Sequence, residues 1–303
     1  MSTQFFRSCL TAVVLTIGLA TASAATAGVA VTIVDANTAT ATISLTDASS
    51  HTYTADVTIT FDQAVNLSAD SLNLTAELID PHTFSGLPAG VSLDPAFPVL
   101  ISVEPPVALF MNSYEGNQVG DGNLAFFNTY YFEFHTTNLE CASATSQYRL
   151  FKAPHGSTAF ADVSDDVLHG SVRARGRGGA FSQFILAKDA RLPLTIALGK
   201  LTSLTTRLLA SAINGTLLTT LTNLLTAISL DLLTLNIAGA INDLDDFIAS
   251  VVAGAAAGDI PNEWKSDRSL NNDAGELISL AQTLRFTLTL LQGNALCLPP
   301  VAP

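Results

Sequence analysis

The first half of the chain alternates apolar and polar residues, a period of two that predicts β-strands with one buried face. Clear examples run over residues 57–61, 72–78 and 99–103. Turn-forming pairs such as Asp80-Pro81 separate these segments. About seven or eight short strands between residues 28 and 188, spaced in this way, predict an antiparallel β-sandwich.

After Pro193 the apolar residues recur at the three- and four-residue spacing of helices. Asn214-Gly215 supplies a stop signal between the first two helices, and Asn272 or Asp273 can cap the last one. Four helices are expected, at about residues 197–212, 217–235, 237–257 and 273–292. These segments predict a bundle of about four helices.

The two periods predict an α+β protein with two domains. A β-sandwich occupies residues 25–190 and the helical domain occupies residues 191–303. Residues 208–230 carry no charge, but ten of these 23 residues are Ser, Thr, Asn or Gly, and the apolar side chains form a stripe. A lipid-facing helix is apolar on all sides, so we expect no transmembrane span in the mature chain.

The N-terminus has the pattern of a secretory signal. Its one charge is Arg7, an apolar stretch runs from Leu10 to Ala20, and Ala22-Ser23-Ala24 is the small-x-small site that signal peptidase accepts. The apolar stretch is shorter than the roughly 20 residues that cross a bilayer. We therefore expect residues 1–24 to be a signal peptide and the protein to be exported, to a periplasm, the cell surface or the medium. A buried N-terminal helix is the alternative.

The composition limits which classes of binding partner are expected. The chain has 26 acidic and 13 basic residues, a net charge of −13, and 13% of its residues are charged. This acidic balance argues against nucleic acid and anionic membranes as partners. With 48% hydrophobic residues, the chain can form a folded core.

Removal of the signal would leave two cysteines, Cys141 and Cys297. An even number in an oxidising compartment favours a disulfide. The bond would close a loop of roughly 156 residues, which chain-entropy models value at about 4 to 5 kcal/mol. It would also bring the two domains side by side. Two separately buried thiols are the alternative.

Two segments resemble modules of exported bacterial proteins. Residues 148–154 and 179–187 resemble the closing strands of β-sandwich modules, and the strand pattern is similar to immunoglobulin-like domains. Residues 240–251, 258–260 and 274–281 resemble the helical FIMAH module, although the inserted residues 261–264 depart from it. The resemblance implies an uncharacterised exported bacterial family, and it supplies no catalytic residues.

Signatures of catalysis are absent from the sequence. The histidines are scattered, no C-x-x-C pair occurs, no serine lies in G-x-S-x-G, and no glycine-rich phosphate loop is present. We therefore predict no catalytic residue, no metal and no cofactor. A pair of catalytic carboxylates stays open, because such pairs are defined by their distance in space.

Arg173, Arg175 and Arg177 alternate, so on a strand all three would face the same side. One hypothesis is an anion-binding edge, because guanidinium groups match carboxylate and phosphate oxygens. The alternative is an ordinary hairpin in which the arginines pair with acids such as Asp162, Asp165 and Asp166.

Two loops contain further candidates. Asp121 and Asn123 lie in a glycine-rich loop and offer oxygen ligands for calcium, although glycine and asparagine are typical of any turn. The loop of residues 260–272 holds Trp264, the one tryptophan. An exposed tryptophan can anchor a partner. Alternatively, it covers one end of the helical bundle.

Together these observations favour a non-catalytic envelope or surface module that binds a polymer or an envelope protein. A carboxylate-dependent secreted hydrolase is one alternative, and it requires a cleft between the two domains. The other alternative is docking to a membrane or partner through the helical half, which requires an exposed stripe over Leu217–Leu224.

Overall fold

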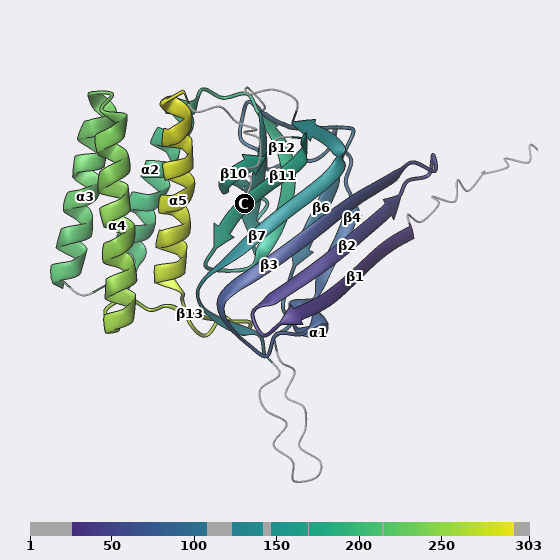
Figure 1. The fold of residues 1–303 in the computed structure, drawn as a ribbon, viewed down its shortest axis with the longest axis horizontal. Coiled ribbons are helices and arrows are strands. Elements are labelled where there is room, and N and C mark those ends of the chain that lie inside the picture. The colour runs from purple at the N-terminus through teal and green to yellow at the C-terminus, as the bar shows by residue number, and fades with distance from the viewer. Residues whose placement is uncertain (1–25, 108–122, 142–146, 169, 214, 294–303) are drawn as a thin grey trace, which may run out of the picture.

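A computed structural model describes residues 26–107, 123–141, 147–168, 170–213 and 215–293. Two antiparallel sheets form a sandwich-like β half, and helices pack beside it (Figure 1). The α+β prediction is confirmed at this level. The expected signal peptide, residues 1–24, lies outside the described residues.

The first sheet has seven strands. In spatial order its path is β1 (Thr26–Asp35), β2 (Thr38–Thr46), β3 (Thr52–Val65), β7 (Ala125–Cys141), β11 (Gly170–Gly178) and β10 (Ser164–Leu168), and β13 (Glu263–Lys265) pairs with β7. The six-stranded second sheet runs β4 (Leu74–Leu78), β6 (Val99–Val103), β12 (Ser182–Asp189), β8 (Tyr148–Pro154) and β9 (Ala161–Asp162), and β5 (Val91–Leu93) pairs with β12.

The period-two pattern places the core between these sheets. In β2, Ala41 and Ile43 are buried while Thr42 and Ser44 are exposed. Aromatic rings join the two layers, and Phe132 of β7 stacks on Phe184 of β12 with 4.0 Å between ring centroids. Burial of such rings is a major source of stability for the sandwich.

The C-terminal half has the four helices that the sequence predicts, α2 (Pro193–Ala210), α3 (Gly215–Leu233), α4 (Ile237–Ala257) and α5 (Asp273–Leu291). Asn272 caps α5, since its side chain accepts a hydrogen bond from the Gly275 amide at 2.8 Å. The described residues contain five helices rather than four, because Ala69–Leu72 forms a short helix, α1, in the β half. The predicted strand over residues 72–78 therefore begins only at Leu74.

Helix α5 connects the two halves. It lies against the sandwich, where it contacts β7, β10 and β11, and its other sides pack on α2 and α4. Helix α3 is farthest from the sheets (Figure 1). Among the described helices, α3 is also the one whose length and composition would allow it to cross a membrane.

Cys141 ends β7 and is fully buried in the sandwich core. Its predicted partner, Cys297, lies outside the described residues. The disulfide therefore stays a prediction.

Candidate functional site

The three arginines lie on β11 and alternate with the buried residues of that strand. Arg173 and Arg175 each approach Glu133 of β7 at 2.7 Å, and Arg177 lies 3.2 Å from Asp165. Since each guanidinium already faces a carboxylate, the strand resembles the paired hairpin more than a vacant anion site. Asp165 was among the expected partners, whereas Glu133, from a strand distant in sequence, was not.

Trp264 is 5% exposed, so the hypothesis of an exposed partner anchor is wrong. Residues 263–265 form β13, which pairs Trp264 with Phe126 of β7. The indole stacks on the Phe126 ring with 5.2 Å between centroids. The tryptophan thus belongs to the sandwich core, and it also lines a pocket that includes residues of α2 and α5.

The calcium candidates gain no support. Asp121 lies outside the described residues, and the Asn123 carbonyl accepts a hydrogen bond from the Asn66 side chain. In the described ranges no group of three or more His, Cys, Asp or Glu residues is placed to hold a metal ion.

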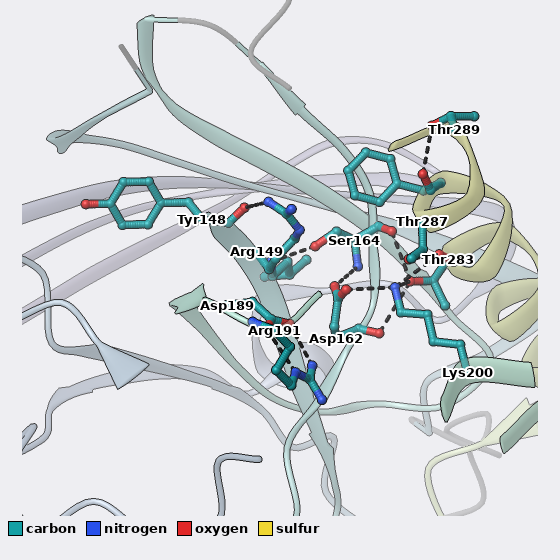
Figure 2. A network of polar contacts seen from close by, with 12 residues as sticks. Tyr148, Arg149, Asp162, Ser164, Asp189, Arg191, Lys200, Thr283, Thr287 and Thr289 are labelled. Carbon is teal, nitrogen blue, oxygen red and sulfur yellow. Dashed lines mark hydrogen bonds and ion pairs between the residues drawn. The ribbon is translucent and has the colours of Figure 1, made fainter. Parts of the chain in front are cut away.

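A buried polar network joins the sandwich to the helices (Figure 2). Lys200 of α2 reaches Asp162 of β9, with 2.7 Å between Nζ and Oδ2 and side chains that are 8% and 2% exposed. The same ammonium donates to Thr283 Oγ1 of α5 at 2.6 Å. Thr283 in turn donates to the Ser164 carbonyl at 3.0 Å. This network is a structural lock, because its members are sealed from solvent.

Two neighbouring acids at this network, Asp162 and Asp165, have pKa values shifted in opposite directions. Burial alone would raise the pKa of Asp162, but the positive charges of Lys200 and Arg149 lower it below its ordinary value. Burial raises the pKa of Asp165 to about 7, against the attraction of Arg177. Neither Asp165 oxygen accepts a well-formed hydrogen bond from a described residue.

A groove of about 450 Å³ crosses the outer face of the first sheet. Gly28 and Ala30 of β1 form a low side, because they pair opposite Ser44 and Thr42 of β2 and carry little or no side chain themselves. The remaining wall comes from β2, β3 and β7, and it includes Thr42, Ser44, Thr54, Asp56 and His135. Five of the eleven lining residues carry a hydroxyl group, and the others are small or apolar residues together with Asp56 and His135.

His135 is held at the side of this groove by a chain of hydrogen bonds. Its Nδ1 lies 3.3 Å from Asp56 Oδ2, and its Nε2 lies 2.8 Å from Ser171 Oγ. The order of groups is that of a Ser-His-Asp triad. However, Ser171 does not line the groove, and the Asp56 side chain is 64% exposed. The arrangement therefore positions the imidazole and gives the serine no substrate pocket.

A second pocket, of about 250 Å³, lies where the sandwich meets the helices. Its lining includes Lys152 of β8, Arg207 of α2, Glu276 of α5 and the loop residues Arg268 and Asn271. Arg207 is occupied by ion pairs with Asp273 and Glu276. Of the described residues that line this pocket, Glu276 is the one carboxylate.

One comparison covers nearly the whole chain. The model of the Family of unknown function (DUF6689) matches residues 12–292. The chain belongs to this family. No curated protein and no solved structure matches it.

Because DUF6689 has no known function, membership supplies no active-site residues. The match runs through both halves of this DUF6689 chain, and no comparison supports the resemblance of the helical half to the FIMAH module. Sequence reasoning missed both concave sites. The threonine-rich alternation of β2 and β3 was the available signal for the groove, whereas the junction pocket joins residues too far apart in sequence to be grouped.

Proposed function

We propose that the protein is an exported, non-catalytic binding module that holds a neutral, hydroxyl-rich polymer, such as a polysaccharide, in the groove on the first sheet. The observation that carries this proposal is the lining of the groove. Hydroxyl groups both donate and accept hydrogen bonds, so they match the hydroxyl groups of a sugar chain. Asp56 and His135 add a stronger acceptor and an oriented ring to the same wall.

The surroundings of the groove favour an extended ligand. Ranks of side chains face outward across neighbouring strands, with Thr40 opposite Thr58 and Ser44 opposite Thr54. Among the described strands, β1 lies at the edge of the first sheet and pairs with β2 alone. A polymer can therefore lie along the face and continue past the edge, and a closed pocket is not needed.

Three further features support the proposal. The N-terminal segment has the pattern of a cleavable signal, and an immunoglobulin-like sandwich would be a common scaffold for a binding module outside the cell. Asp56 and His135, the two ionisable residues that line the groove, face each other, which suits a neutral ligand. The two halves are locked together by the buried Lys200–Asp162 pair, so the module would present a rigid face.

Hydrolysis is less well supported. A carboxylate-dependent glycosidase needs two carboxyl groups about 5 to 10 Å apart around its substrate. Glu276 is the one carboxylate among the described lining of the junction pocket, and it is paired with Arg207. Docking through the helices is also less favoured, because Leu221 is fully buried and Leu217 and Leu224 are partly buried.

Affinity electrophoresis in gels that contain a soluble glucan, xylan or galactomannan tests the proposal. Wild-type protein should be retarded by at least one of these polysaccharides. Ala30→Trp should abolish the retardation, because the indole fills the low side of the groove. Thr32→Trp is the matched control, since Thr32 is exposed on the same strand but does not line the groove.

Two results would contradict the proposal. One is that none of the polysaccharides retards the wild-type protein. The other is that Ala30→Trp and Thr32→Trp bind equally well. Circular dichroism of both variants confirms that each remains folded.

A further inference from the structure

The junction pocket contains Lys152, which differs from the other described lysines in its lack of a nearby carboxylate. The described residues include four lysines, and three of them have a carboxylate oxygen within 4 Å of the ammonium: Lys188 beside Asp94, Lys200 beside Asp162, and Lys265 beside Glu263. Lys152, which lines the pocket, has none among the described residues. Its Nζ donates to the Ala180 carbonyl at 2.6 Å.

We propose that the junction pocket binds the carboxylate group of a small acid, with Lys152 and Arg268 as its direct contacts. An ammonium has three donors, and Lys152 uses one of them on the Ala180 carbonyl. It also lies 5.6 Å from the centre of the Tyr130 ring, which holds the ammonium by a cation–π contact. The remaining donors are available to a ligand in the pocket.

Arg268 brings a second group of donors to the same pocket. Its nearest carboxylate, Glu104, lies 3.6 Å from the guanidinium, beyond the usual length of a charge-assisted hydrogen bond. Glu104 also contacts His155. The Arg268 backbone has a φ of 58°, a left-handed conformation that is strained for a residue with a side chain. A strained residue at a pocket is often maintained because its side chain position is useful.

Besides Lys152 and Arg268, the described titratable residues that line the pocket are His155, Arg207 and Glu276, and each already has a partner of opposite charge. Arg207 is committed to Asp273 and Glu276, so it adds positive potential but few free donors. Glu276 is in turn occupied by Arg207. The pocket lies between two packed halves, which is a common location for small-molecule sites. Its volume of about 250 Å³ suits a compact acid, such as a single uronic acid, more than a polymer.

The protonation of Lys152 gives the site a characteristic pH dependence. Burial lowers the pKa of Lys152 to about 8, and the negative charge of Glu276 partly opposes this shift. A bound carboxylate favours the charged ammonium and raises this pKa again. Affinity should therefore fall as the pH rises above about 8, by up to about tenfold per pH unit.

Trp264 provides the readout, because it is the one tryptophan of the chain and lines the pocket. The full mature protein is titrated at pH 7 with glucuronate and with succinate, and the fluorescence of Trp264 is recorded. Glucose is the neutral control, and phosphate and sulfate are included as other oxyanions. We expect a saturable response to at least one carboxylate and none to glucose.

Lys152→Met should weaken this binding at least tenfold, and Arg268→Ala should weaken it less. Lys188→Met is the matched control, because Lys188 pairs with Asp94 outside the pocket, and it should bind like the wild type. If Lys152→Met fails to fold, Arg268→Ala and the loss of affinity above pH 8 carry the test.

The inference is overturned if no carboxylate gives a saturable response, or if phosphate or sulfate binds and the carboxylates do not. Equal affinity in wild type and in a folded Lys152→Met or Arg268→Ala variant would also overturn it. Because this site and the groove are lined by different residues, failure here leaves the polysaccharide proposal unchanged.

Discussion

Helices α3 and α5 each have 19 residues, yet their places in the molecule are opposite to what their sequences suggest. Helix α3 has Asp231 as its one charged residue and is the most membrane-like helix in the described chain, but only four of its residues are buried. Helix α5 includes Asp273, Glu276 and Arg285, and ten of its residues are buried. Burial here follows the contacts that the fold makes available, because α5 has the sandwich on one side and the bundle on the other.

Threonine has a different role in each helix. In α3 the Thr222 and Thr226 hydroxyls donate back to carbonyls of their own helix, at 2.7 and 2.9 Å. In α5 the Thr283 hydroxyl links α2 to the sandwich. On the outer helix the threonine hydroxyls therefore bond within their own helix. In the seam, the contact region between the sandwich and the helices, a threonine hydroxyl connects three segments. The seam should accordingly be sensitive to substitution, and α3 should be tolerant.

The largest effect is expected at the buried ion pair. Lys200→Met should lower the free energy of unfolding by about 3–5 kcal/mol, because it leaves the Asp162 charge buried without its partner. Urea denaturation followed by circular dichroism measures the change. The double variant Lys200→Met/Asp162→Leu should recover much of the loss, since it removes both charges. A single-variant loss below about 1 kcal/mol would show that the pair is not a lock.

The next largest effect is expected in the pH dependence of the free energy of unfolding, through the buried carboxyl of Asp165. With a folded pKa of about 7, Asp165 keeps its proton between about pH 4 and 7, where the unfolded chain has already lost it. Asp165 should therefore lower the stability as the pH rises through this window, by up to about 1.4 kcal/mol per pH unit.

Asp165→Asn tests this expectation through the difference in unfolding free energy between variant and wild type, measured at pH 4.5, 6 and 7.5. Relative to the wild type, the variant should gain stability as the pH rises. A difference that is independent of pH would mean that the Asp165 carboxyl is ionised throughout, with Arg177 as its effective partner.

Two helical glycines should respond to alanine substitution with smaller changes in stability, of opposite sign. A Cβ on Gly275 of α5 would lie 2.1 Å from the Asn128 carbonyl oxygen, whereas a Cβ on the exposed Gly199 of α2 would meet no atom within 4 Å. Gly275→Ala should cost about 1–3 kcal/mol through overpacking of the seam. Gly199→Ala should stabilise by about 0.5–1 kcal/mol through helix propensity. Thermal melts of both variants provide the measurement, and equal shifts would mean that α5 can move away from the sheet.

The smallest effect is expected on the outer face of α3. Thr222→Ala removes a hydroxyl that bonds only to its own helix, and alanine is the better helix former. The unfolding free energy should change by less than about 0.5 kcal/mol, or rise slightly. A loss above about 1 kcal/mol in the same urea assay would place α3 in an interface that the outer position of the helix does not suggest.

Local patterns predicted the elements well. The alternation over residues 57–61 and 99–103 falls in β3 and β6, and the helix expected at residues 237–257 has the bounds of α4. The Asn272 cap was also predictable, because capping depends on residues three apart.

Contacts between distant segments were not predictable in this way. The strand β13 has three residues and forms only because β7 offers it a partner, so the sequence around Trp264 suggested a loop. Lys200, Asp162 and Thr283 come from three separate elements, and no spacing rule relates them. The candidate sites depend on such contacts, and for that reason they emerged only from the fold.

The late position of β13 in the sequence also affects how the chain folds during synthesis. Synthesis proceeds from the N-terminus, so β7 is made long before residues 263–265 follow it. Until then, the segment of β7 that pairs with β13, residues 125–127, lacks that neighbour, and Phe126 lacks the indole that stacks on it. An unpaired strand edge beside exposed aromatic rings invites aggregation. A product truncated before β13 would keep that edge unpaired, and we expect it to aggregate or to be cleared by proteases.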